Sequence, residues 1–382
     1  MKPKNIIFFI PSFTYGGTEL HSLEIASLCQ KRGYKVVFGA FSRKRDLVAD
    51  LEKKGIEWFF IPDLQMGQRM SIRFIFKAFL FGLRLRWKYH HDVIITATSH
   101  CNFLGGLIWK VAGAKTHWWH QWGIAPIDAP GNKEKLAVRW TPEFIANSKT
   151  VANFWANRHP EVAQNISVIN NPLHRQSNRN RMSTEWDFHA FFAQNHHFDL
   201  KMVMTANFFS EKDHLTVLRA LHNLKLKYPD KRFLLILPGI PPGLSLKVSE
   251  AKALAFDLGL YHEVIFPGAL GGIRELLSYM DVGILSTLSE GMSNSAIEYL
   301  LSGLRVALTR IPANIELMNG MDDRVFFEVG DVDGLTQILE NYLLNPPKPE
   351  WAEQVSEAVK KTFSTESFDS AYNQKLNQLF QD

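Results

Sequence analysis

The sequence predicts an α/β fold built from two doubly wound parallel sheets. Short apolar runs alternate with helical patterns along the chain, beginning with Asn5–Ile10 and a helix expected over residues 18–31. Runs that lack polar alternation are typical of parallel strands covered on both faces. At 382 residues the chain is longer than one hydrophobic core usually supports, so we expect two such domains.

The remaining elements follow the same alternation. Further strands are expected over residues 35–41, 57–61, 92–96, 116–119, 144–147, 166–169, 201–206, 233–237, 263–268 and 281–286, and helices over 273–280 and 335–344. A polar stretch without periodicity, residues 174–184, indicates a linker. We therefore place one domain at residues 1–173, a linker and domain entry at 174–200, and a second domain at 201–362, followed by a last helix at 363–382.

A glycine pair, Gly16 and Gly17, separates the first strand from the first helix. Ligands of open α/β sheets bind beyond the carboxyl ends of the strands, so this loop is a candidate binding loop. Its spacing is not Gly-x-Gly-x-x-Gly, which argues against a nicotinamide nucleotide. A plain tight turn remains the alternative.

The stretch from residue 286 to residue 298 carries the strongest functional signal. Glu290 follows a strand, Gly291 allows a tight turn, and Glu298 lies on the next helix, on a face that looks back at the loop. Ser293, Asn294 and Ser295 offer capping oxygens, and the first free amides of a helix favour an anion.

Two carboxylates beside an anion site suit a ligand that also has hydroxyl groups. A nucleotide sugar has both, since its diphosphate can bind the amides while ribose and sugar hydroxyls donate to Glu290 and Glu298. Each hydrogen bond to a carboxylate is worth about 1.5–3 kcal/mol. The alternative, an ordinary capped helix with solvated acids, stays open on spacing alone.

The same residues resemble a known family. The pattern Ser-Glu-Gly-x6-Glu-x4-Gly, which begins at Ser289 and contains both glutamates, resembles the signature of retaining glycosyltransferase family four. The similarity continues through residues 302–309 and 314–317. The resemblance implies a GT-B fold, in which two Rossmann-like domains face each other across a cleft. The N-terminal domain would bind the acceptor, the second domain would bind the nucleotide sugar, and residues 363–382 would pack back on the N-terminal domain.

The resemblance also implies roles for individual residues of the second domain. Glu298 would bind ribose hydroxyls and Glu290 hydroxyls of the donor sugar, while Lys212 would hold the donor diphosphate. Asn207 stands where the family usually has an arginine. Either Arg175 or Arg305 supplies the missing charge, or the site relies more on Lys212 and the helix amides. The remaining donor-binding candidates are Pro267 and Gly268 beside the nucleobase, and Gly291, Met292, Ser293 and Asn294 at the diphosphate.

In the first domain the resemblance points to the glycine loop and to one histidine. Gly16 and Gly17 would approach the donor phosphates and the acceptor, and His120 would contact the transferred sugar. His117 should sit within the strand. The neighbouring tryptophans, Trp118, Trp119 and Trp122, can stack on sugar rings. Burial in the core is the alternative for these tryptophans and for His120.

Residues 69–88 combine a basic stripe with aromatic and aliphatic side chains. Arg69, Arg73, Lys77, Arg84 and Lys88 fall within an arc of about 100° on a helical wheel. One interpretation is a helix that lies on an anionic membrane surface, and the other is a sheet-covering helix with a solvated basic face. No nucleic-acid-binding module accompanies the stripe, so we expect no nucleic-acid partner.

Composition sets further limits. The net charge of +5 and a pI of about 9.0 favour anionic partners. Cys29 and Cys101 are the only cysteines, which excludes a disulfide scaffold and a zinc site of clustered cysteines. Asp331 and Asp333 open a helix, so acidic capping explains them better than metal binding. We expect no cofactor and no metal requirement. The apolar run near the N-terminus is too short for a signal peptide, so we expect a cytoplasmic protein, peripheral at most to the inner face of the cytoplasmic membrane.

The expected activity is transfer of a hexose or N-acetylhexosamine from a nucleotide sugar to a glycan or lipid-linked glycan in cell-envelope polysaccharide synthesis. UDP is favoured only because it is the commoner donor nucleotide in the family. A GT-B sugar-nucleotide epimerase or phosphorylase is the nearest alternative. An inactive binding partner in glycan assembly is the alternative from another class, because Asn207 replaces the usual arginine.

Overall fold

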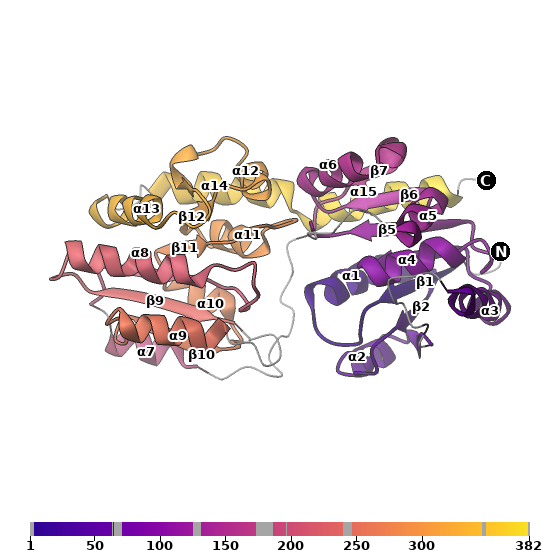
Figure 1. Ribbon diagram of the computed structural model, residues 1–382, viewed down its shortest axis with the longest axis horizontal. Coiled ribbons are helices and arrows are strands. Elements are labelled where there is room, and N and C mark those ends of the chain that lie inside the picture. The colour runs from indigo at the N-terminus through magenta and orange to yellow at the C-terminus, as the bar shows by residue number, and fades with distance from the viewer. Residues whose placement is uncertain are drawn as a thin grey trace. The chain divides into compact units, whose positions relative to one another are not determined.

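The computed structural model divides the chain into two compact units, Met1–Pro172 with Thr365–Asp382, and Leu173–Ser364. It describes residues 4–62, 64, 71–124, 131–172, 186–195, 197–239, 247–345 and 349–380, with residues 349–351 and 380 described by backbone alone. Figure 1 shows the elements of both units, which are described here one at a time.

The first unit is a seven-stranded parallel sheet in the order β3-β2-β1-β4-β5-β6-β7. Its strands are β1 (Asn5–Ile10), β2 (Lys35–Ala40), β3 (Glu57–Phe60), β4 (Val93–Ala97), β5 (Thr116–Gln121), β6 (Glu143–Ala146) and β7 (Ile166–Val168). Its helices are α1 (Gly17–Lys31), α2 (Val48–Lys53), α3 (Ile72–Tyr89), α4 (Ser99–Ile108), α5 (Asn132–Trp140), α6 (Lys149–Arg158), the 3₁₀ helix η1 (Pro160–Asn165) and α15 (Thr365–Phe380).

The central strands of this sheet are buried on both faces, as their continuous apolar sequence predicts. Phe8 of β1 pairs in register with Phe38 of β2, and the two rings stack with centroids 4.8 Å apart. The C-terminal helix α15, yellow in Figure 1, packs on this unit through the buried Tyr372. Lys375 of α15 also donates a 2.6 Å hydrogen bond to Glu143. The last helix therefore completes the first core although it ends the chain.

The second unit is a six-stranded parallel sheet in the order β10-β9-β8-β11-β12-β13. Its strands are β8 (Leu200–Val203), β9 (Phe233–Pro238), β10 (Val264–Gly268), β11 (Val282–Leu285), β12 (Arg305–Thr309) and β13 (Phe326–Phe327). Its helices are α7 (Phe188–Gln194), α8 (His214–Lys227), α9 (Lys247–Asp257), α10 (Ile273–Ser278), α11 (Asn294–Leu301), α12 (Pro312–Met318), the 3₁₀ helix η2 (Asp323–Val325), α13 (Val332–Leu344) and α14 (Pro349–Thr362).

Helices cover both faces of this second sheet. Met202 of β8 joins a core cluster with α8, α9 and α13, whereas its neighbour Val203 joins a cluster with α10, α11 and α14. Part of the predicted linker differs from expectation, because residues 188–194 form α7. Its Phe188 and Phe192 are buried in the second of these clusters, so this segment is part of the domain core. The prediction of two doubly wound parallel sheets is confirmed.

Each sheet reverses its strand order once, and these reversals locate the candidate binding edges. The reversal lies between β1 and β4 in the first unit and between β8 and β11 in the second. At such a point the two neighbouring loops leave the carboxyl edge in opposite directions and open a crevice, where ligands of open α/β sheets bind. In the described part of the chain, no helix is both long enough and apolar enough to cross a bilayer.

Candidate active site

Two loops that are distant in sequence meet at the reversal point of the second sheet. The loop after β8 carries Lys212, and the loop after β11 carries Glu290. Lys212 and Thr287 form an isolated antiparallel bridge. Backbone hydrogen bonds from Asp213 to Ser286 (3.0 Å) and from Leu288 to Glu211 (2.8 Å) extend this contact. The two loops are thus fixed to each other by main-chain groups, independently of their side chains.

The side chains of Lys212 and Glu290 form an ion pair at this junction, in which the Lys212 Nζ donates to Glu290 Oε1. Both side chains remain partly accessible, at 19% and 17% exposure. Burial raises the pKa of Glu290 above its ordinary value, and the neighbouring ammonium of Lys212 opposes that rise. A ligand with a diphosphate and hydroxyl groups can separate this pair, because it offers an anion to the lysine and donors to the carboxylate.

The amino end of α11 lies directly beyond Glu290 and Gly291. Our expectation that local side chains cap this helix is wrong for two of the three residues. Ser293 Oγ donates to Asn314 Oδ1 at 2.6 Å and does not cap the helix. Ser295 Oγ donates to the Thr205 carbonyl at 2.6 Å. The Asn294 amide donates to the Met292 carbonyl at 3.1 Å. The serine hydroxyls do not cap the next amides of α11, and uncapped amides at a helix start favour an anion.

The other predicted residues of this stretch sit around that helix end. Gly291 is buried, Met292 is half-buried and Asn294 is exposed. Glu298 lies in the second turn of α11 and is half-buried. The next residue, Tyr299, is fully buried and accepts a 2.6 Å hydrogen bond from the Thr205 amide after β8. This tyrosine was not predicted, and it holds α11 against the carboxyl end of β8.

Arg305 does not supply the positive charge that the family's usual arginine would provide at position 207. Asn207 is exposed in the loop after β8. Arg305 is the first residue of β12, at the amino edge of the sheet, and its Nη1 donates to the carbonyls of Tyr342 (2.9 Å) and Asn345 (2.8 Å). The other candidate, Arg175, lies outside the described residues. Among the described residues, Lys212 is therefore the cation that lies at the junction of the two loops.

Pro267 and Gly268 end β10, two strands away from β8 on the same edge. The Gly268 carbonyl accepts a 2.9 Å hydrogen bond from the Gly239 amide, and the Pro238 carbonyl accepts one from the Ala206 amide at 3.2 Å. The ends of β10, β9 and β8 are thereby joined. Except for Arg305 at the amino edge, the predicted residues of the second unit that the structure describes lie at this one edge of the sheet.

The predicted glycine loop of the first unit lies at the reversal point of its own sheet. Gly16 is the N-cap of α1, and Gly17 is its first residue. A Cβ at Gly16 would collide with the Glu19 carboxylate, which folds back over the loop and accepts a 3.1 Å hydrogen bond from Ser12. Burial raises the pKa of Glu19, and its hydrogen bonds oppose that rise. A side chain at position 16 would therefore displace the Glu19 carboxylate from the loop.

His120 does not reach a surface in this structure. Its side chain is wholly buried, with Nε2 2.9 Å from the Tyr372 hydroxyl and Nδ1 3.3 Å from the Thr96 carbonyl. Burial lowers the pKa of His120 to about 3. The expected contact with a sugar would require Tyr372 to move away. Trp118 and Trp119 are also buried, so the core interpretation of those two tryptophans is confirmed.

Thr98 was missed by the sequence analysis. It follows β4 at the reversal point and has a backbone φ of 76°, which is unusual for a β-branched residue. Such strain is common at functional sites and is maintained by the surrounding structure. No local sequence pattern marks the position, because a threonine before a helix ordinarily suggests a relaxed N-cap.

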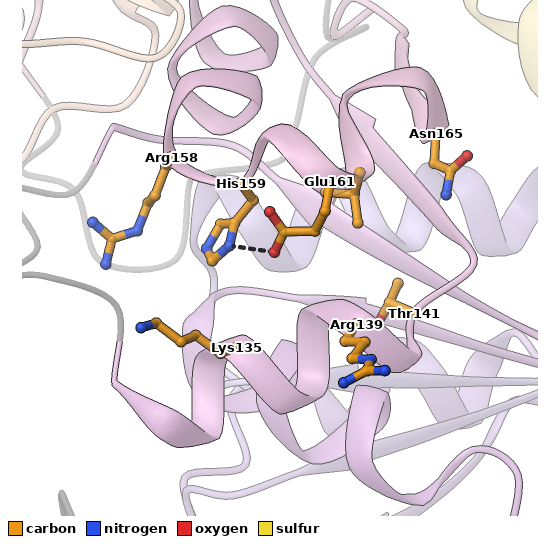
Figure 2. A pocket seen from close by; sticks show the side chains of 8 residues that line it. Lys135, Arg139, Thr141, Arg158, His159, Glu161 and Asn165 are labelled. Carbon is orange, nitrogen blue, oxygen red and sulfur yellow. Dashed lines mark hydrogen bonds and ion pairs between the residues drawn. The ribbon is translucent and has the colours of Figure 1, made fainter.

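A separate pocket of about 440 Å³ lies at the opposite, amino edge of the first sheet (Figure 2). It is lined by Lys135, Arg139, Thr141, Arg158, His159, Glu161, Val162 and Asn165. Two of its basic side chains already contact an acid, since Arg158 binds Glu134 at 2.6 and 3.0 Å and His159 Nε2 lies 2.7 Å from the same carboxylate. None of the predicted site residues lines this pocket.

Metal-ligating side chains do not gather in the part of the chain that the structure describes, where no group of three or more His, Cys, Asp or Glu residues could hold an ion. Asp331 caps α13 by accepting a 2.9 Å hydrogen bond from the Gly334 amide. The prediction that this acid is a helix cap is confirmed.

Comparison with known proteins agrees with this architecture. Residues 15–176 match the family model described as Glycosyltransferase Family 4, and residues 199–345 match the model described as Glycosyl transferases group 1. No curated protein matches the sequence.

Three solved structures are similar in fold. A glycosyltransferase from Rickettsia africae is 18% identical over 100% of both chains, with a TM-score of 0.82. HepE from Anabaena, solved with UDP and glucose, is 18% identical over 98% of this chain and 100% of its own, with a TM-score of 0.79. A sucrose-phosphate synthase from Thermosynechococcus elongatus is 15% identical over 99% of both, with a TM-score of 0.71.

The matched segments together cover both units and include the glycine loop, Lys212 and both glutamates. They favour a glycosyltransferase over the epimerase and phosphorylase alternatives, and they agree with the GT-B fold of the similar structures. The chain belongs to glycosyltransferase family four, the group 1 glycosyl transferases.

Proposed function

We propose that the protein transfers a hexose or an N-acetylhexosamine from a UDP-sugar to a glycan or lipid-linked glycan acceptor in cell-envelope polysaccharide synthesis. The transfer would retain the configuration of the sugar and would need no metal. The observation that carries this proposal is the junction of Lys212 and Glu290 beside the amino end of α11. It unites a cation, helix amides and a carboxylate at a sheet reversal.

Each group at the junction has a task in this reaction. Negative charge develops on the nucleoside diphosphate as the sugar leaves. Lys212 and the amides of residues 291–293 would stabilise that charge without rearrangement, because the main-chain contacts hold them in place. Glu290 would accept hydrogen bonds from the donor sugar, and Glu298 from the ribose. The departing phosphate would take the acceptor proton, as the family resemblance implies.

The choice of UDP rests on the similar structures. HepE was solved with UDP and glucose, and a trehalose-6-phosphate protein from E. coli was solved with UDP-2-fluoro glucose. In the first unit, Gly16 and Gly17 would approach the donor phosphates and the acceptor. The role of His120 at the transferred sugar depends on the release of its ring by Tyr372.

The test is to incubate the protein with a panel of UDP- and GDP-sugars and candidate acceptors and to measure the free nucleoside diphosphate. Lys212→Ala and Glu298→Gln should each lower kcat/KM by about 100-fold, which is typical for loss of one preorganised group. Lys225→Ala and Glu263→Gln are matched controls, because this pair forms a 2.6 Å ion pair in the same unit, away from the site. Full activity in both site variants would refute the assignment.

We further propose that α3 lies on an anionic membrane surface and places the enzyme at the inner face of the cytoplasmic membrane. Among the residues that the structure describes, this helix buries one face and exposes a second apolar face, made of Ile72, Ile75, Phe76, Phe79, Leu80 and Trp87. Arg73, Lys77, Arg84 and Lys88 lie between the two faces, within an arc of about 60°. Arg69, predicted as part of the stripe, lies outside the described residues.

This arrangement favours a membrane over water as the neighbour of α3. A sheet-covering helix with a solvated basic face would not need six exposed apolar side chains, whose contact with water is unfavourable. In a bilayer interface the apolar face would enter the acyl boundary, and each flanking cation would add about 1 kcal/mol near anionic lipid.

Sedimentation with phosphatidylglycerol vesicles tests this contact. Charge reversal of Arg73, Lys77 and Arg84 to glutamate should abolish binding, and so should replacing Ile75, Phe76 and Phe79 by serine. Vesicles of phosphatidylcholine alone should bind weakly. Failure of the unaltered protein to bind anionic vesicles would end this part of the proposal while leaving the transferase assignment intact.

A further inference from the structure

Three consecutive basic residues follow β2 at the carboxyl edge of the first sheet. Arg43, Lys44 and Arg45, here called the basic loop, are all exposed and lie between β2 and α2. Because the sheet is parallel, the end of β2 lies on the same edge as the end of β1, its direct neighbour.

Main-chain hydrogen bonds join this segment to the loop that follows β1. The amide of Ser42 donates to the Pro11 carbonyl at 3.0 Å, and the amide of Leu47 donates to the Phe13 carbonyl at 2.8 Å. The loop after β1 ends at the glycine pair in front of α1. The basic loop therefore borders the candidate binding loop of the first unit and is anchored on both sides of its three cations.

Aromatic rings, rather than acids, hold the two guanidinium groups of the basic loop. Arg43 lies 5.6 Å from the Phe60 ring centroid, and Arg45 lies 5.5 Å from the ring centroids of both Trp58 and Phe60. Phe13 packs against the same two rings, at 5.6 and 5.7 Å. The stacked faces restrict the arginines and leave their N–H edges available for a ligand.

The positive charge of this loop is not neutralised by ion pairs. Within the described residues, none of its three cations pairs with a carboxylate. Asp46 is the one acid next to them in sequence, while Asp50 and Glu52 of α2 accept hydrogen bonds from Tyr15 (2.6 Å) and Trp58 (3.2 Å). Three adjacent like charges repel one another, so their concentration beside a binding loop favours an anionic ligand.

We propose that the basic loop binds a phosphate or pyrophosphate group carried by the acceptor. This inference rests on the proposed transferase function, because the donor diphosphate is assigned to Lys212 and α11 in the second unit. Arginine forks suit phosphate oxygens through paired hydrogen bonds, and Lys44 adds a point charge beside them. The acceptor class is thereby narrowed from any glycan to a glycan or sugar that bears a phosphate near its reacting end.

The test measures binding of inorganic pyrophosphate by calorimetry to protein saturated with UDP, so that the donor site is occupied. Replacing Arg43, Lys44 and Arg45 together by glutamine should weaken pyrophosphate binding by at least about tenfold and leave UDP affinity unchanged. The matched control replaces Lys31, Lys360 and Lys361 by glutamine. These residues are exposed on α1 and α14, and their loss changes the net charge equally. The control should bind pyrophosphate as the unaltered protein does.

Three outcomes would overturn the proposal: no pyrophosphate binding by the unaltered protein, undiminished binding by the loop variant, or equal loss in the control. A vesicle arm separates the two sources of phosphate. If the loop variant loses affinity for phosphatidylglycerol vesicles while free pyrophosphate never binds, the loop serves lipid headgroups and the acceptor assignment is wrong. Failure to bind UDP would instead count against the proposed function, whereas UDP binding without pyrophosphate binding would count against this inference alone.

Discussion

The first six strands of the first unit follow the same order as the six strands of the second, but the two units differ in how far their titratable side chains are exposed. In the second unit, Lys212, Glu290 and Glu298 remain partly accessible. In the first unit, polar groups along β4 and β5, His117 and His120 among them, are buried and satisfy one another. Thr96 Oγ1 lies 2.8 Å from His117 Nε2, and Asn102 donates to the His120 carbonyl at 2.9 Å.

The difference indicates how one architecture serves two tasks. A buried network of neutral groups makes a unit rigid and gives it a precise shape, but it cannot bind a charged ligand, because its donors and acceptors are already engaged. Accessible ion pairs can exchange partners when a ligand arrives. We therefore assign the electrostatic work of the reaction to the second unit, and in the first unit only to its exposed loops.

The largest expected effect of this contrast is acid sensitivity. In the first unit, burial lowers the pKa of His91 to about 4 and the pKa values of His117 and His120 to about 3. In the second unit, burial lowers the pKa of His214 to about 4. These folded-state pKa values lie below the unfolded value of about 6.5, so stability is full above pH 6.5 and is lost as the pH falls through 6.5 toward 3–4.

At pH 5 each such histidine should cost about 2 kcal/mol, which gives roughly 6 kcal/mol in the first unit and about 2 kcal/mol in the second. The raised pKa values of Glu19 and Glu290 have the opposite sign and occur once in each unit, so they leave the contrast in place. Hydrogen exchange resolved to each unit, at pH 7 and pH 5, measures the difference. His91→Leu should remove about a third of the stability that the first unit loses between pH 7 and pH 5. Replacing His100, which is exposed, by leucine should leave that loss unchanged. Equal acid sensitivity of both units would contradict the comparison.

A smaller effect is expected from paired glycine substitutions. A Cβ at Gly105 would lie 2.5 Å from Thr96 Cγ2 and 2.6 Å from His117 Nε2, and a Cβ at Gly239 would collide with the Ala206 carbonyl that precedes Asn207. Gly105→Ala and Gly239→Ala should each lower the free energy of unfolding by about 1–3 kcal/mol. Only Gly239→Ala should also weaken UDP binding, because it displaces the loop that carries Lys212. Denaturant titration measures the stability loss in each variant, and calorimetry measures UDP binding. Weaker UDP binding by Gly105→Ala would contradict this prediction.

The sequence was sufficient for the fold and for placing the central candidate residues at one edge of the second sheet. Apolar runs located the strands, and the parallel arrangement brought Lys212 and Glu290 to one edge although 78 residues separate them. Arg305 could have been excluded as a phosphate ligand from the same reasoning, because a residue that begins a parallel strand lies at the opposite edge from the ligand.

Other features could not be deduced, because they depend on tertiary partners. Ser293 has the sequence context of a helix cap, yet its hydroxyl donates to Asn314, which lies on a different helix, α12. The burial of His120 depends on Tyr372, which is 252 residues away in sequence. The basic loop lacks a local motif, and its significance follows from the aromatic rings of β3.

The smallest expected effect tests whether the buried network of the first unit is structural. Tyr372→Phe removes the hydroxyl that lies 2.9 Å from His120 Nε2 and leaves that nitrogen without this partner. Since the site is fully buried, we expect a loss of about 1–3 kcal/mol in the free energy of unfolding, with kcat/KM for transfer unchanged. Tyr228→Phe is the matched control, because its hydroxyl donates to Glu340 at the surface of the second unit, where the loss should be smaller than at Tyr372. If Tyr372→Phe instead changes KM for the sugar donor while stability is retained, His120 acts at the transferred sugar and the network belongs to the active site.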